Sequence, residues 1–151
     1  MTGIPGIGKS TYIKNNMYDP CFKTVSRDEI RFSMLREGEE HFSHECDVFD
    51  TFVREINESL AAGFHTVADA THINKASRLK LLRRIDRRLY ERVISICLVG
   101  DIDIAIARNE KRKGSRRYVP QEAICRMYEQ LTLPTDKEPF DRIIIERIKE
   151  T

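Results

Sequence analysis

The chain has 151 residues, of which 40% are hydrophobic and 33% are charged, and this length fits one domain that buries its own core. The 26 basic and 24 acidic side chains leave a net charge of only +2, which argues against a globally basic nucleic-acid-binding domain. No apolar run approaches the roughly 20 residues that cross a bilayer, so no membrane partner is expected. The four cysteines form no Cys-x-x-Cys pair, which favours a cytoplasmic protein with reduced thiols.

Short strand-like runs alternate with longer helical runs along the chain. Strands are predicted at residues 22–26, 64–68, 93–99 and 140–145. Helices are predicted at residues 9–16, 28–36, 43–62, 74–90, 101–113 and 120–131. This alternation is typical of a doubly wound α/β fold, in which helices sandwich a parallel sheet. We therefore predict a single α/β domain over residues 1–151.

One strand of this fold has no room in the sequence. The first motif begins at Gly3, whereas a phosphate loop of this kind normally follows a central strand. We expect that the first strand is missing or truncated, and a truncated start is the favoured explanation. The alternative is a fold that dispenses with a middle strand, which would expose the edges of its neighbours. A further possibility is that a trimmed N-terminus leaves a chain unable to fold or act alone.

Residues 3–11 read G-I-P-G-I-G-K-S-T and match the phosphate-loop pattern G-x-x-x-x-G-K-[ST] at every fixed position. Glycines let backbone N–H groups approach phosphate oxygens, and the following helix N-terminus adds its dipole. We expect Lys9 to bridge the β- and γ-phosphates and the Ser10 hydroxyl to ligate Mg²⁺. The alternative is a Gly-rich turn that merely opens a helix. The predicted cofactors are ATP and Mg²⁺, and the predicted nucleotide-binding residues are Gly3, Pro5, Gly6, Gly8, Lys9, Ser10 and Thr11.

Two acidic positions follow predicted strands, at the edge where open α/β sheets bind ligands. Asp28 lies at a helix start, where an acid is usually only a cap or a dipole partner. Arg31 shares its helix face, so that a carboxylate could accept a hydroxyl proton while a guanidinium holds a substrate anion. Asp69 follows the next strand, and its alternative role is that of a turn-forming Asp.

A basic stretch over residues 108–117 is interrupted by Gly114-Ser115. Such a run is usually a solvated helix end, but after a phosphate loop it favours a mobile lid over the triphosphate, at about residues 108–119. A second basic set is interpreted either as the soluble face of the helix at 74–90 or as a track for a nucleic-acid backbone. It comprises Arg83, Arg84, Arg87, Arg88 and Arg92.

Two further patterns resemble metal ligands only loosely. His41, His44 and Cys46 lie in an acidic helical entry, where we do not expect a metal site. Asp101 and Asp103 stand at the start of a helix, and Asp101 is interpreted as its cap.

Taken in order, these motifs resemble the 5′-kinase domain of bacteriophage polynucleotide kinase and related P-loop kinases of AAA type and zeta-toxin-like type. The likeness rests on the phosphate loop, on S-R-D-x-x-R at residues 26–31 and on R-N-x-K-R at residues 108–112. It covers nearly the whole chain except the missing strand, and it implies a P-loop kinase fold.

The resemblance also implies a role for individual residues. Asp28 corresponds to the general base that takes the proton of a 5′-hydroxyl, and Arg31 to the arginine that holds the neighbouring substrate phosphate. Asp69 and Thr71 correspond to positions near the acceptor nucleotide. Arg112 corresponds to the lid arginine that clamps the donor phosphates alongside Lys9.

Two departures from the phage enzyme limit this correspondence. Ala70 separates Asp69 from Thr71, which shifts any hydroxyl contact. The chain also has no Asp-x-Asp-Gly-Thr motif, because Ile104 follows Asp103, so no 3′-phosphatase activity is expected.

We predict an ATP- and Mg²⁺-dependent phosphotransferase that moves the γ-phosphoryl group onto a hydroxyl. The most specific acceptor is the 5′-hydroxyl of DNA or RNA, so a nucleic-acid end is the predicted partner. The alternatives are a P-loop kinase of a small-molecule hydroxyl and an ATP-binding or ATPase module that transfers nothing. In the last of these, Asp28 and Arg31 would be dispensable.

Overall fold

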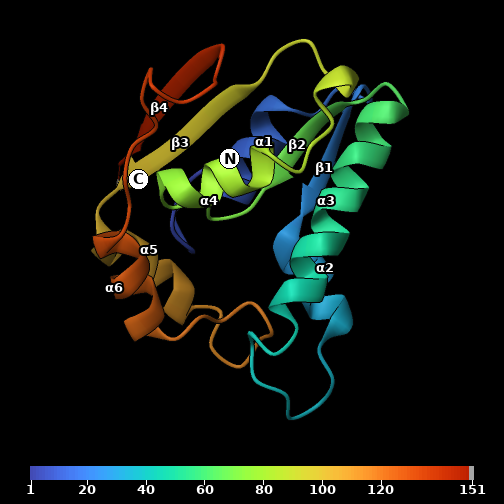
Figure 1. Cartoon of the computed structure of the whole chain (residues 1–151). Coiled ribbons are helices and arrows are strands. Elements are labelled where there is room, and N and C mark those ends of the chain that lie inside the picture. The colour runs from blue at the N-terminus through green and yellow to red at the C-terminus, as the bar shows by residue number, and fades with distance from the viewer. Residues whose placement is uncertain (150–151) are drawn as a thin grey trace.

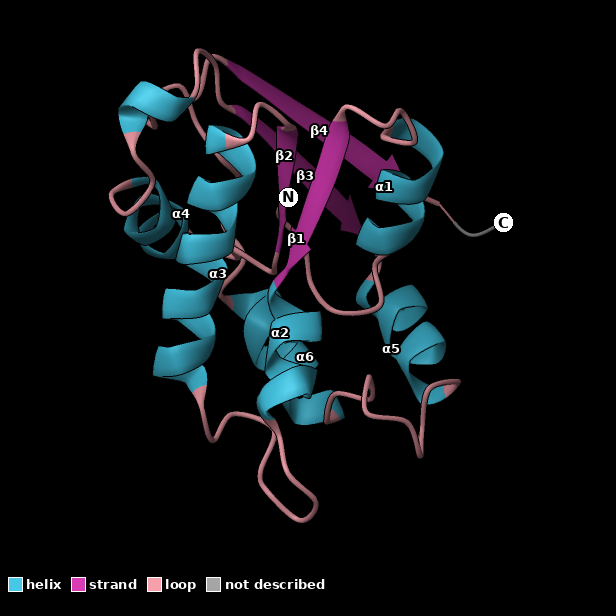
Figure 2. Ribbon diagram, turned by 90° about the vertical axis from the view of Figure 1, so that its right-hand side faces the viewer, coloured by secondary structure: helices cyan, strands magenta, loops and turns pink. Residues whose placement is uncertain are grey.

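The computed structural model describes residues 1–149, in which helices lie on both sides of parallel strands (Figures 1 and 2). Figure 2 shows α3 and α4 on one side of the strands and α1 and α5 on the other. The elements in chain order are α1 Lys9–Asn16, β1 Phe22–Ser26, α2 Arg27–Met34, α3 Glu45–Ala61, β2 His65–Asp69, α4 Lys75–Leu82, the 3₁₀ turn η1 Arg87–Leu89, β3 Ile94–Gly100, α5 Ile102–Glu110, α6 Gln121–Glu129 and β4 Arg142–Ile148.

The strands form two parallel pairs. β1 pairs with β2 in the register Phe22↔His65, and β3 pairs with β4 in the register Ile94↔Arg142. The predicted α/β fold with parallel strands is therefore confirmed, although the described strands make two sheets of two strands each.

The first two residues lie between the two sheets, where Figure 1 shows the N-terminus. Thr2 forms an isolated parallel bridge with Cys97, and the Met1 nitrogen donates to the Ala68 carbonyl at 2.9 Å. Beyond this contact, the facing edges of β2 and β3 line a largely apolar groove of about 720 Å³. The β1–β2 and β3–β4 sheets are thus separated at the position where the first strand was expected to be missing.

The core has two parts, one for each half of the molecule. In the first, the apolar face of α3 packs against β1, α2 and α4, and Val48 and Phe52 are fully buried at the helical spacing of four. In the second, Ile4 and Ile7 of the phosphate loop pack with Leu98 and with residues of α5 and α6. The two isoleucines of the phosphate loop therefore attach the loop to this second part of the core.

One predicted helix is much shorter in the structure. The prediction of a helix over residues 74–90 is wrong after Leu82, because a side chain of α3 captures the next turn. The Asn57 amide donates to the Arg84 carbonyl at 3.3 Å and accepts from the Asp86 nitrogen at 2.9 Å. The second basic set consequently lies beyond α4, with Arg87 and Arg88 in η1, rather than along one helix face, although all its members are exposed. Arg84 pairs there with Asp50 at 3.1 Å.

Other local predictions are confirmed. The helix at 9–16 and the strand at 22–26 have the predicted bounds, and the remaining strands begin one or two residues later than predicted. Asp101 caps α5, accepting from the Asp103 nitrogen at 3.0 Å. None of the helices within residues 1–149 combines the length and the apolar character that crossing a membrane requires.

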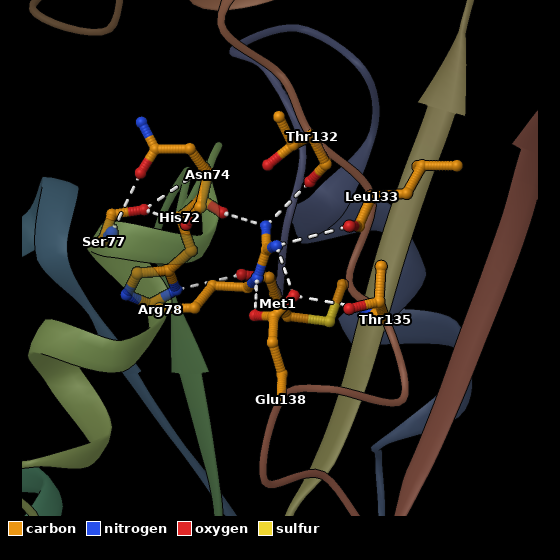
Figure 3. A network of polar contacts seen from close by, with 9 residues as sticks. All are labelled: Met1, His72, Asn74, Ser77, Arg78, Thr132, Leu133, Thr135 and Glu138. Carbon is orange, nitrogen blue, oxygen red and sulfur yellow. Dashed lines mark hydrogen bonds and ion pairs between the residues drawn. The ribbon is translucent and has the colours of Figure 1, made fainter.

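A buried ion pair joins α4 to the segment that leads into β4 (Figure 3). The Arg78 guanidinium donates to both Glu138 carboxylate oxygens, at 2.7 and 2.8 Å, and both side chains are almost fully buried. Arg78 also donates to the carbonyls of His72 and Thr132, at 3.3 and 2.8 Å. Glu138 accepts from the Thr135 nitrogen at 3.1 Å. The network therefore ties the segment after α6 to the turn after β2.

His72 stands in that turn with a positive φ of 41° and is buried beside Phe52. Its Nε2 has no hydrogen-bond partner among the described residues, and burial lowers its pKa from 6.5 to about 3. Between these two pH values the unfolded chain binds the extra proton and the folded one does not. The free energy of unfolding is therefore unaffected by His72 above pH 6.5, and it decreases as the pH falls from 6.5 toward 3.

We expect the free energy of unfolding to fall by about 2 kcal/mol between pH 7.5 and pH 5 through His72 alone. The variant His72→Asn should lose this part of the pH dependence, because Asn does not titrate and tolerates the left-handed backbone. Urea unfolding of both proteins at the two pH values measures the difference. Equal losses in both proteins would contradict a neutral buried His72.

Candidate active site

The phosphate loop runs from the Thr2 bridge to α1, and three of its glycines have left-handed or related φ values. These values are 149° at Gly3, 82° at Gly6 and 115° at Gly8. The Gly3 nitrogen donates to the Thr71 carbonyl at 2.9 Å, which attaches the loop to the segment after β2. The loop is therefore held in a fixed shape at the carboxyl ends of β2 and β3, where open α/β sheets bind ligands.

Lys9 is the cation of this loop. Its Nζ donates to the carbonyls of Gly3 and Ile4, at 2.9 and 3.2 Å. Burial lowers the pKa of Lys9, while the negative charges of Asp69 and Asp28 oppose that change. The charge of the lysine is thus balanced in part by two carboxylates at or just after the ends of the neighbouring strands β1 and β2.

Gly6 offers a direct test of the loop, because a Cβ there would lie 2.3 Å from the Ala105 carbonyl oxygen of α5. Replacing Gly6 with Ala should move the loop off α5 and weaken Mg-ATP binding by about tenfold or more. Gly38→Ala is the matched control, since Gly38 has a φ of 81° but nothing within 4 Å of its Cβ position. Calorimetric titration with Mg-ATP measures the effect, and equal affinities in the two variants would refute the close packing of the loop.

Asp69 ends β2 and is buried, and its Oδ1 has no hydrogen-bond partner among residues 1–149. Burial raises the pKa of Asp69, and the charge of Lys9 opposes this. Hard divalent cations take oxygen ligands of this kind, directly or through water. A buried, unpartnered carboxylate oxygen whose charge acts on the phosphate-loop lysine fits a Mg²⁺–triphosphate. The resemblance implies a position near the acceptor for this residue, and that role stays a prediction.

Asp28 and Arg31 are brought together at the start of α2, whose N-cap is Ser26 and not Asp28. The Asp28 side chain is 61% exposed and its carboxylate forms an ion pair with the Arg31 guanidinium. Both residues line a pocket of about 120 Å³, together with Pro5 of the phosphate loop and Thr71. Asp28 therefore faces a space that is bounded on one side by the phosphate loop.

Glu45 is a charged residue of this pocket that the sequence did not indicate. It is the first residue of α3, and its carboxylate accepts from Arg31 Nε at 2.6 Å and from Arg27 Nη2 at 2.8 Å. In the sequence it appears only as one of several acids in a helical entry. His44, another residue of that entry, pairs with Glu39 at 2.8 Å, and the part of the chain that the structure describes holds no group of three or more potential metal ligands.

The predicted lid is the connection between α5 and α6. Arg112 lies in it, exposed, and its positive charge contributes to the lowered pKa of Lys9. Arg108 and Asn109, the first two residues of the R-N-x-K-R motif, fix its base. Asn109 is fully buried and exchanges hydrogen bonds of 2.7 and 3.1 Å with the Val119 backbone. Arg108 donates to the Ile7 carbonyl at 3.3 Å, which connects α5 to the phosphate loop.

Known proteins resemble this chain in sequence and in structure. It is 26% identical over 146 residues to the L-seryl-tRNA(Sec) kinase of Methanococcus maripaludis, in an alignment covering 93% of this chain and 54% of that protein. The chain thus spans about half the length of this curated relative.

Two solved structures share the fold. A gluconokinase from Sinorhizobium meliloti 1021 has a TM-score of 0.65 and 17% identity, covering 99% of this chain and 81% of that one. A sugar kinase from Janibacter sp. HTCC2649 has a TM-score of 0.68 and 16% identity, covering 97% and 82%. The specific resemblance to polynucleotide kinase stays a prediction.

A family model described as an AAA domain matches residues 1–134, which is most of the chain and includes the phosphate loop, both acidic positions and the lid. P-loop kinases of this kind use ATP with Mg²⁺. The chain belongs to this AAA domain family, AAA_33, of P-loop kinases.

Proposed function

We propose that this chain transfers the γ-phosphoryl group of ATP to a hydroxyl that lies against Asp28. The observation that carries this proposal is the pocket in which the Asp28 carboxylate and Pro5 of the phosphate loop face the same space. A hydroxyl in that pocket lies between a proton acceptor and the loop that cradles the triphosphate. This is the arrangement that in-line transfer requires.

Each residue then has a distinct task. Lys9 neutralises phosphate charge, Ser10 and Asp69 would hold Mg²⁺, and Arg112 closes over the triphosphate from the lid. Mg²⁺ would neutralise charge on the phosphate oxygens. The acceptor oxygen bonds to the γ-phosphorus while the bond to the bridging oxygen breaks, and ADP leaves. The acceptor proton passes to the Asp28 carboxylate.

The acceptor that best fits this geometry is a small hydroxyl compound. The pocket holds only about 120 Å³, and the Arg31 guanidinium is already paired with two carboxylates. A second candidate is the 5′-hydroxyl of a polynucleotide. The motif order at residues 26–31 and 108–112 favours it, and a tRNA kinase is among the relatives.

Transfer from γ-labelled ATP with Mg²⁺ separates these candidates. The acceptors are glycerol, glucose and thymidine on one side and a 5′-hydroxyl oligonucleotide on the other, with a 5′-phosphorylated oligonucleotide as control. Label on the uncharged small compounds supports the first candidate, and label on the hydroxyl oligonucleotide alone supports the second. Binding and hydrolysis of ATP without transfer to any acceptor would identify an ATPase module and refute the kinase proposal.

A further inference from the structure

Glu45 pairs with both arginines that line the pocket around Asp28. Its two carboxylate oxygens take hydrogen bonds from both arginines there, with Arg31 Nε at 2.6 Å, Arg31 Nη2 at 3.3 Å and Arg27 Nη2 at 2.8 Å. The Arg31 side chain is only 8% exposed, and the Phe42 ring lies 5.3 Å from its guanidinium carbon. Arg31 therefore cannot turn out to solvent to meet a substrate while Glu45 holds it.

The charges around the pocket cancel. Two guanidinium groups, Arg27 and Arg31, face two carboxylates, Asp28 and Glu45. The remaining titratable group is His41, whose pKa is lowered by burial and by the charge of Arg31, so it adds no positive charge at neutral pH. The pocket therefore has no uncompensated positive charge to offer an anion, although two arginines line it.

Glu45 and Arg31 each favour the charged form of the other. Partial burial alone would raise the pKa of Glu45, but the hydrogen bonds and charge of Arg31 outweigh it and lower the pKa. Burial would likewise lower the pKa of Arg31, but Glu45 and Asp28 more than compensate and raise it. The Glu45–Arg31 ion pair is consequently present at neutral pH.

We infer that Glu45 is a specificity-determining residue, whose carboxylate occupies Arg31 and Arg27 and so makes the pocket select an uncharged hydroxyl compound over one that carries a phosphate near its hydroxyl. This inference rests on the proposed function for its meaning in catalysis, but its charge argument concerns the pocket itself. Without the Glu45 charge the pocket carries one net positive charge. A bound anion can then accept the charge-assisted hydrogen bonds that Arg31 and Arg27 donate to Glu45 in the unmodified chain.

Binding of inorganic phosphate tests the charge argument without catalysis. The phosphate loop is first saturated with Mg²⁺ and a non-hydrolysable ATP analogue, and phosphate is then titrated calorimetrically. Glu45→Gln should bind phosphate about tenfold or more tightly than the unmodified chain, because it keeps the side-chain size and removes the charge. Glu45→Asp, which keeps the charge, should not gain affinity. An equal gain in both variants, or a gain in neither, would overturn the inference.

Kinetics test the same inference on one hydroxyl. Thymidine and thymidine 3′-monophosphate share the 5′-hydroxyl and differ by one phosphate. The unmodified chain should have a higher kcat/KM for thymidine, and Glu45→Gln should shift this ratio toward the monophosphate, mainly through KM. Asp50→Asn, on the exposed face of α3, is the control and should leave the ratio unchanged.

The possible failures are distinguishable. If no acceptor is phosphorylated but phosphate binding still depends on Glu45, the proposed function fails and the charge argument holds. If thymidine is phosphorylated and the monophosphate is preferred without any substitution, the inference is wrong and the kinase proposal stands. Thermal melting of each variant shows whether it is folded, and the comparison of the two acceptors on the unmodified chain needs no variant.

Discussion

Replacing Asp28 with Asn is expected to lower kcat by about 10²–10⁴-fold, while Mg-ATP binds with nearly unchanged affinity. Asn has the same size but cannot take up the proton of the acceptor hydroxyl. The side chain is 61% exposed, so its replacement removes no buried contact that the fold requires. The ion pair with Arg31 is lost, but Glu45 still holds that guanidinium.

Single-turnover transfer from labelled ATP measures the chemical step, and calorimetry measures nucleotide affinity. Asp103→Asn is the matched control, because Asp103 also lies in the first turn of a helix that follows a strand, and it is exposed. It should retain full activity. Turnover of Asp28→Asn near that of the unmodified chain would exclude Asp28 as the base, and loss of ATP binding would show that its role is structural.

Replacing Arg78 with Met is expected to lower the free energy of unfolding by about 3–5 kcal/mol. The substitution leaves the Glu138 carboxylate buried without its partner, since Glu138 is only 1% exposed in its side chain. It also removes the donors to the His72 and Thr132 carbonyls. The free energy of unfolding of a domain of this size is about 5–15 kcal/mol in total, so this variant should be close to unfolding at physiological temperature.

Urea unfolding at pH 7.5 measures the change, and two further variants identify its cause. The double variant Arg78→Met with Glu138→Met should recover part of the loss, because no unpaired buried charge remains. Arg84→Met breaks the exposed pair with Asp50 and should cost less than about 1 kcal/mol. A similar small effect for Arg78→Met would mean that the buried pair does not hold α4 against the segment before β4.

Local sequence signals were sufficient for many elements of this fold. The helix at 9–16 and the strand at 22–26 were predictable because Gly8 opens the helix and a short run of β-formers makes the strand. The helix after residue 74 was mispredicted for a reason outside its own sequence. Leu79, Leu82 and Ile85 continue a helical pattern, but the Asn57 amide of α3 binds the backbone of the following turn. A long-range hydrogen bond of this kind does not change the hydrophobic periodicity of the segment, so the sequence pattern cannot reveal it.

The candidate site divides in the same way. By itself, the sequence determined that the chain has a phosphate loop, with Lys9 and Ser10 at its end, and that Asp28 and Arg31 share one helix face. These features depend on spacing along a single segment, which a motif records. Only the tertiary structure decided that the Asp69 carboxylate is buried and acts on the charge of Lys9, and that Glu45 takes up the charge of Arg31. Electrostatic compensation acts through space, and Arg31 and Glu45 lie 14 residues apart, so no local pattern could report it.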